Sequence, residues 1–175
     1  MENEAFEKIL ASHKAWLRSE GGKRADLQCV YLQGANLQGA NLRYANLQST
    51  NLRYAYLCHA DLRFTDLRNA IISHADLETA DLRHADLQGA YLCHANLRGA
   101  NLRGANLRGA NLRNASLQGA NLVGIKMNWR SHALLGEILQ RDAVTLEHRS
   151  AANAVSKSLD LCWDDFERKF SENQK

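Results

Sequence analysis

Arginine recurs every twenty residues in the middle of the chain, and aromatic or imidazole rings follow most of these arginines. The candidate interaction face consists of Arg43, Arg63, Arg83 and Arg103 with the adjoining Tyr44, Phe64 and His84. Because arginine binds phosphates and aromatic rings stack on bases, this composition is typical of a surface that binds nucleic acid. We favour the alternative of a solvated, charge-balanced face, since an aspartate stands two residues before Arg63 and before Arg83.

A second series with the same interval carries imidazole rings. It consists of Tyr54, His74, His94 and Asn114, with Cys93 beside His94. Imidazole and thiol groups bind transition metals. The series contains no carboxylate that could orient the rings, however, and the ligand spacings typical of metal sites are missing. We therefore predict stacked rings here, with no metal and no cofactor.

The remaining reactive side chains form no catalytic pattern. Asp76 and Glu78 are close in sequence, but carboxylates on a flat, solvated face lack the desolvation that acid–base catalysis uses. Neither H-E-x-x-H nor G-x-S-x-G occurs, so the sequence predicts a protein that is not an enzyme. The cysteines lack C-x-x-C spacing and are expected to be free thiols: Cys29, Cys58, Cys93 and Cys162.

All these series belong to one uninterrupted repeat. Residues 25–124 read as twenty tandem pentapeptides of the form Ala-Asn/Asp-Leu-X-X. A period of five matches neither the 3.6-residue period of a helix nor the two-residue period of a strand. A coil that turns one corner per pentapeptide keeps both the Ala and the Leu position inside. The other three positions then face water.

The repeat resembles the pentapeptide-repeat family. That resemblance implies an all-β solenoid, a right-handed quadrilateral parallel β-helix with four pentapeptides per coil. Solenoids need caps at their ends, so we expect short α-helical caps at both. The expected parts are an N-terminal capping helix over residues 1–22, the β-helix over residues 23–128, and a C-terminal helical cap or dimerisation segment over residues 129–175.

The expected caps are amphipathic. Residues 3–18 predict a helix whose Trp16 and Leu17 should lie on the layer of Leu27 and Leu32. The C-terminal helices either cap the solenoid or form a homodimer, and the sequence leaves both alternatives open. Their apolar residues include Leu134, Leu135, Ile138, Leu139, Trp163, Phe166 and Phe170.

The charge and composition of the chain limit the functions and the cellular location that we expect for it. With 22 Lys and Arg against 19 Asp and Glu, and with no long apolar run or signal peptide, we expect a cytoplasmic protein that does not enter a membrane. The most favoured function is a scaffold for an unidentified protein partner. The resemblance also implies an alternative, inhibition of DNA gyrase or topoisomerase by imitating the negative charge of DNA. Nine Arg against seven acidic residues in 25–124 argue against imitation, and nucleic-acid binding through the arginines is a further alternative.

Overall fold

The structure is a computed structural model that describes residues 3–128, and it begins with helix α1, Asn3–Leu17. Glu4 stands in the first turn and Lys14 in the last, which places each charge at the end of the helix dipole that favours it. The chain leaves the helix through Gly21 and Gly22, both with positive φ. A Cβ at Gly22 would collide with the carbonyl of Ser12, so the return of the chain along the helix requires glycine there.

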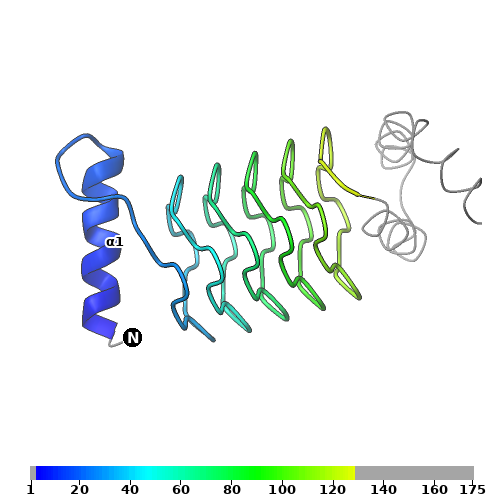
Figure 1. Cartoon of the computed structure of the whole chain (residues 1–175), viewed down its shortest axis with the longest axis horizontal. Coiled ribbons are helices and arrows are strands. Elements are labelled where there is room, and N and C mark those ends of the chain that lie inside the picture. Colours follow the sequence, from blue (N-terminus) through cyan, green and yellow to red (C-terminus); the bar gives the residue numbers. More distant parts are fainter. Residues whose placement is uncertain (1–2, 129–175) are drawn as a thin grey trace, which may run out of the picture.

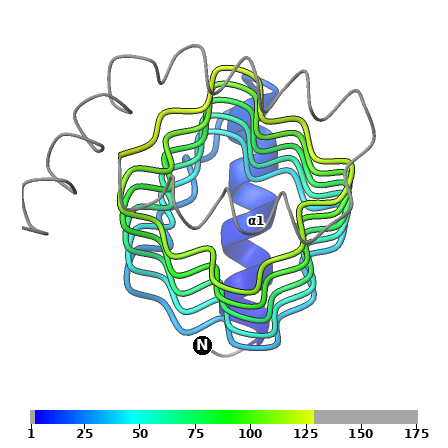
Figure 2. The same cartoon turned by 90° about the vertical axis from the view of Figure 1, so that its right-hand side faces the viewer.

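The rest of the described chain is a rod of stacked coils (Figure 1). Parallel bridges join each outward residue before a Leu to the residue twenty positions later, from Asp26↔Asn46 to Asn106↔Lys126. Viewed along the rod, the coils superimpose as a four-sided outline (Figure 2). The predicted solenoid is therefore present, but its parallel pairing consists of isolated bridges separated by turns rather than of continuous strands.

Each pentapeptide closes a tight turn. In the first one, the N–H of Val30 donates to the carbonyl of Leu27 at 3.2 Å, and Cys29 between them has a φ of 58°. The N–H of that same Cys29 donates to the carbonyl of Gln48 in the next coil at 3.0 Å. Pairing with the neighbouring coil thus fixes a left-handed residue that an isolated turn would disfavour.

Leucine and alanine fill the interior. Leu27, Leu47, Leu87 and the equivalent leucines are 0–5% exposed along the whole rod. Among the described residues, the buried polar side chains are His13, at the helical end, and Thr50 and Thr65 inside the coils. The hydroxyl of Thr65 donates to the carbonyl of Leu42 at 2.9 Å. The inward and outward positions expected from the repeat are those of the structure.

Helix α1 crosses the open end of the first coil (Figure 2). Phe6 and His13 are buried, and Ile9 and Leu10 pack against the core. The predicted contact of Trp16 and Leu17 with the layer of Leu27 and Leu32 is wrong, because neither residue is among those that pack against the core. Trp16 is 37% exposed, and its ring stacks on His13. The helix therefore docks through its earlier turns, as Phe6, Ile9, Leu10 and His13 follow one helical stripe.

The predicted C-terminal cap or dimerisation segment, residues 129–175, lies outside the described residues. Within residues 3–128, no helix has the length and apolar character needed to cross a bilayer.

Candidate interaction surfaces

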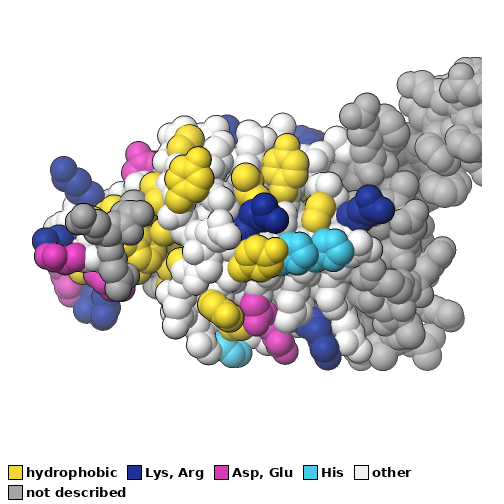
Figure 3. All heavy atoms as spheres, turned by 90° about the horizontal axis from the view of Figure 1, so that it is seen from below, with side chains coloured by type: hydrophobic (Ala, Val, Ile, Leu, Met, Phe, Trp, Pro, Cys, Tyr) yellow, Lys and Arg dark blue, Asp and Glu magenta, His cyan; other side chains and the backbone are white. Residues whose placement is uncertain are grey.

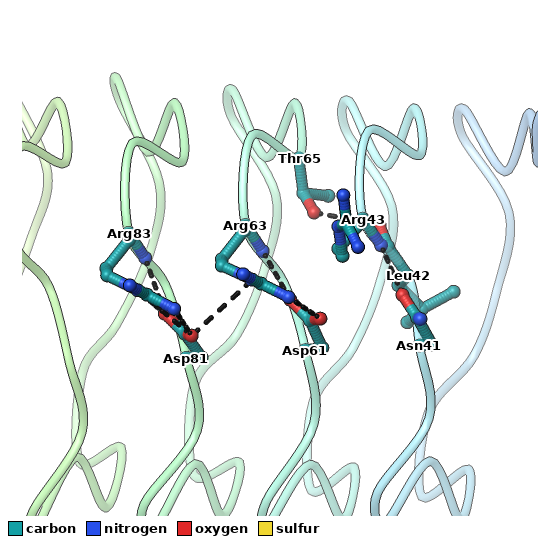
Figure 4. Close-up of polar contacts among 8 residues, drawn as sticks. All are labelled: Asn41, Leu42, Arg43, Asp61, Arg63, Thr65, Asp81 and Arg83. Atoms are coloured by element: carbon teal, nitrogen blue, oxygen red, sulfur yellow. Dashed lines mark hydrogen bonds and ion pairs between the residues drawn. The ribbon is translucent and has the colours of Figure 1, made fainter. Parts of the chain in front are cut away.

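The arginine face comprises residues 41–44, 61–64, 81–84 and 101–104, and its two central arginines are neutralised. The guanidinium of Arg63 binds Asp61 through Nη2–Oδ2 at 2.6 Å and Nε–Oδ1 at 2.8 Å. Its Nε also lies 3.5 Å from Oδ2 of Asp81, which in turn pairs with Arg83 at 2.7 Å (Figure 4). Partial burial alone would raise the pKa of Asp81, but the bonds and charge of Arg83 outweigh it and the pKa is lowered.

The outer arginines of this face lie in a different setting. Asn41 and Asn101 replace the aspartates, so Arg43 and Arg103 have no ion pair with any described residue. The guanidinium carbon of Arg43 lies 5.5 Å from the centroid of the Tyr44 ring, a cation–π contact. The arginine ladder is therefore not a uniform strip of positive charge, and the charge-balanced arrangement holds at its centre.

Aromatic rings on the arginine face stack in a column along the rod. The rings of Tyr44 and Phe64 lie 5.1 Å apart at 7°, and those of Phe64 and His84 lie 5.1 Å apart at 12°. At the helical end, Trp16 meets Tyr44 edge-on at 6.3 Å. Since each ring covers the face of the next, the column presents ring edges to solvent and offers few free faces on which a base could stack.

The tyrosine face, on the opposite side of the coil, comprises residues 31–34, 51–54, 71–74, 91–94 and 111–114. Tyr54 stacks on His74 at 5.0 Å, and His74 stacks on His94 at 4.7 Å and 4°. Figure 3 shows this line of a hydrophobic ring followed by histidines. A second column on the face carries Tyr31 and Tyr91, which are 77% and 51% exposed.

The histidine column is built for stacking. Nδ2 of Asn114 lies 3.5 Å from Nε2 of His94, which continues the column by one coil. The thiol of Cys93 donates to the carbonyl of Asn111 at 3.9 Å. Among residues 3–128, no three His, Cys, Asp or Glu side chains gather in a way that could hold a metal ion.

On the two faces between the arginine face and the tyrosine face, carboxylates form hydrogen bonds or ion pairs with neighbouring side chains. Oδ1 of Asp76 accepts a hydrogen bond from Nδ2 of Asn96 at 2.9 Å, and its Oδ2 accepts one from the thiol of Cys58 at 2.9 Å. Burial and this aspartate raise the pKa of Cys58 to about 11, so the thiol stays protonated at neutral pH. Asp66 forms an ion pair with Arg68 at 2.6 Å, and the hydrogen bond from Arg68 lowers the pKa of Asp66.

The sequence predicts the arginine face as the candidate interaction surface, and on the tyrosine face it indicates a series of imidazoles considered only as a metal site. Sorting the outward positions by the twenty-residue period also shows that residues of the tyrosine face include no Asp or Glu. Each of the other three faces carries at least two acidic residues. This absence of acidic residues is the sequence feature that distinguishes the tyrosine face from the other three.

Stacked coils with a continuous aliphatic core define a solenoid repeat protein. A family sequence model described as pentapeptide repeats, in eight copies, matches residues 25–63, 60–99 and 94–128. The chain belongs to the pentapeptide repeat family. No curated protein sequence matches it at a significant level.

Solved structures agree with this assignment. The chain is similar to the pentapeptide repeat protein Rfr23 from the cyanobacterium Cyanothece 51142, with 30% identity, a TM-score of 0.62, and coverage of 69% of this chain and 96% of that one. It is also similar to the pentapeptide repeat protein alr5209 from Nostoc PCC 7120, with 32% identity, a TM-score of 0.52, and coverage of 67% and 93% respectively.

Proposed function

We propose that the protein is a non-enzymatic scaffold that binds a protein partner on the flat sides of its coil. The family resemblance implies that this coil is right-handed. The proposal includes a cytoplasmic location and no cofactor. The observation that carries the scaffold proposal is that the outward rings are already held in place by stacking on one another. Rings 4.7–5.1 Å apart support one another in both columns, so a partner does not have to immobilise them when it binds.

A rigid backbone supports the same proposal. From Cys29 to Gly104, the left-handed residue of each turn also donates its N–H to the next coil, as Tyr44 does to the carbonyl of Arg63 at 3.0 Å. A face built in this way keeps its shape whether or not a partner is present. Pre-organised, flat surfaces with tyrosine and arginine have the composition of protein interfaces.

Nucleic-acid binding is a second candidate, and one specific observation favours it. The four pentapeptides of residues 95–114 each carry one arginine, and no Asp or Glu occurs in residues 87–128. That coil is therefore ringed with positive charge, which attracts phosphates in a salt-dependent manner. The arginines are Arg98, Arg103, Arg108 and Arg113.

Affinity capture from a nuclease-treated bacterial lysate tests the proposal. The immobilised wild type is compared with an Arg43, Arg63, Arg83, Arg103→Gln variant at low and high salt. We expect the same protein to be retained by both forms, with a loss of no more than about twofold in the variant, because exposed charges at an interface change the association rate and its salt dependence more than the affinity.

A different result would replace the scaffold with nucleic-acid binding. That result is nucleic acid retained from an untreated lysate at low salt by the wild type only, together with no protein retained after nuclease treatment.

A further inference from the structure

The tyrosine face is the one side of the solenoid without negative charge. Over residues 25–124, the arginine face carries Asp61 and Asp81, and the remaining two faces carry Asp26, Asp66, Asp86, Asp76 and Glu78. The charges on the tyrosine face are those of Arg53 and Arg113, both of which are exposed. A partner that lies on this face therefore meets cations and no anions.

Exposed rings accompany these cations. Tyr31, Tyr54 and Tyr91 are about half exposed or more, and Ile71 lies in the same column as Tyr31 and Tyr91. The guanidinium of Arg53 lies 5.6 Å from the centroid of the Tyr54 ring, a cation–π contact that places the charge beside this tyrosine. Tyrosine and arginine are the side chains that most often supply binding energy at protein interfaces.

Two other occupants fit the face less well. A second copy of the chain that docked through its own tyrosine face would bring Arg53 and Arg113 against those of the first, with no carboxylate on either tyrosine face to compensate. Single-stranded nucleic acid needs successive free ring faces for its bases. In the column of three stacked rings, His74 is covered on both sides by Tyr54 and His94, and in the other column Asn51 and Ile71 separate Tyr31 from Tyr91.

We propose that the tyrosine face binds an acidic polypeptide segment that carries aromatic or aliphatic side chains. This inference rests on the proposed scaffold function and names the partner's chemistry. Arg53 and Arg113 are three coils apart, which corresponds to about 14 Å at the usual spacing of parallel strands. An extended segment covers that distance in about four residues, so acidic residues at i and i+4 with an apolar residue at i+2 would match both arginines and the rings between them.

A random copolymer of Glu and Tyr contains this spacing and serves as the probe. Its binding to the full chain is measured by fluorescence anisotropy, beside polyglutamate and oligo(dT). We expect the copolymer to bind more tightly than polyglutamate, because only the copolymer has rings to place against the tyrosines. Oligo(dT) is expected to bind more weakly than the copolymer.

Two variants test the face, each with a matched control. Tyr31, Tyr54, Tyr91→Asn uses residues that the same columns already carry at Asn51, Asn111 and Asn114, so the fold should be retained. Its control is Tyr56→Asn, which removes an exposed tyrosine from another face whose column already carries Asn36 and Asn96. Arg53, Arg113→Gln removes the charges, and Arg98, Arg108→Gln removes the same number elsewhere on the rod.

We expect each tyrosine-face variant to bind the copolymer about tenfold more weakly, the loss typical of removing interface anchors. The controls should stay within about twofold of the wild type, and circular dichroism melts verify that all variants are folded. Equal binding by the wild type and both tyrosine-face variants would overturn the inference, as would tighter binding of oligo(dT) to this face or a dimer that the tyrosine substitutions dissociate.

The proposed function can survive that failure. If the lysate protein captured by the wild type is also captured by the tyrosine-face variants, the scaffold remains and only its binding face is wrong. If no protein is captured after nuclease treatment, the scaffold function itself fails.

Discussion

His13 joins helix α1 to the first coil and is fully buried. Its Nδ1 accepts a hydrogen bond from the N–H of Ala25 at 3.1 Å, so the ring proton lies on Nε2. Burial lowers the pKa of His13 and outweighs the effect of the Arg43 backbone, which acts in the opposite direction, while the positive charge of Arg24 also lowers the pKa. Protonation would place a second proton where the Ala25 N–H is donated and would leave a buried charge.

Docking of α1 should therefore weaken in acid. Because the folded state binds fewer protons than the unfolded state, the contribution of His13 is complete above about pH 6.5 and is lost as the pH falls below it, by at most about 1.4 kcal/mol per pH unit. Hydrogen exchange at the Ala25 amide, corrected for the intrinsic rate, should speed up between pH 7.5 and 5. His13→Asn is the control, since its Oδ1 can accept the same bond without titrating. Equal pH dependence in both proteins would contradict the assignment.

At the level of the elements, stability comes from the inward columns and very little from the outward ion pairs. Leu77 is 1% exposed in the middle of the rod, whereas the Arg83 and Asp81 side chains of the ion pair are 37% and 28% exposed. Burying an unpaired ammonium group among aliphatic side chains costs several kcal/mol. An exposed ion pair contributes about 0–1 kcal/mol.

Leu77→Lys should consequently unfold the protein, and Arg83→Ala should leave Tm almost unchanged. Thermal melts followed by circular dichroism measure both. Leu77→Met is a suitable control, because a volume-conserving change costs less than about 1.5 kcal/mol. A stable Leu77→Lys protein, or a large drop in Tm for Arg83→Ala, would reverse the assignment of inward and outward positions.

The coil was predictable from the sequence because one rule, Ala and Leu every five residues, applies twenty times. The pairing of Arg63 with Asp61 was also predictable, since residues two apart on one face must be neighbours. The docking of α1 was not, because the hydrogen bond from Ala25 to His13 depends on the path of residues 18–24. Without that path, the periodic pattern alone could not separate the buried His13 from the more exposed Trp16.

The left-handed backbone conformation of the bulky turn residues could not be predicted from the sequence either. Tyr44 and Phe64 have φ values of 62° and 58°, a region that large side chains rarely adopt. Stacking between these rings and hydrogen bonds to the next coil offset the strain. Both contacts join residues twenty apart, so local propensity gives no indication of them. The tyrosine face is difficult to predict from local sequence for a related reason, because its distinguishing property is the absence of acidic residues, which appears only when all four faces are compared.

At the level of the whole molecule, charge changes along the rod. Residues 87–128 contain no Asp or Glu, and the acidic residues of the solenoid all lie in the coils before them. Several of these are neutralised by arginines of the same coil, including Asp61, Asp66 and Asp81. A protein that imitates DNA must present continuous negative charge to a site that binds phosphates. No face of this solenoid does so.

We therefore expect no inhibition of DNA supercoiling by DNA gyrase, even at a large molar excess of the protein, as measured by the mobility of plasmid topoisomers in a gel. An Asp26, Asp66, Asp86→Asn variant distinguishes the mechanisms if inhibition does occur. Asn46 and Asn106 already stand in the same column, so the variant should fold. Inhibition that disappears in this variant would establish charge imitation and contradict the prediction. Inhibition that persists there but disappears in Tyr31, Tyr54, Tyr91→Asn would instead indicate a partner held through the tyrosine face.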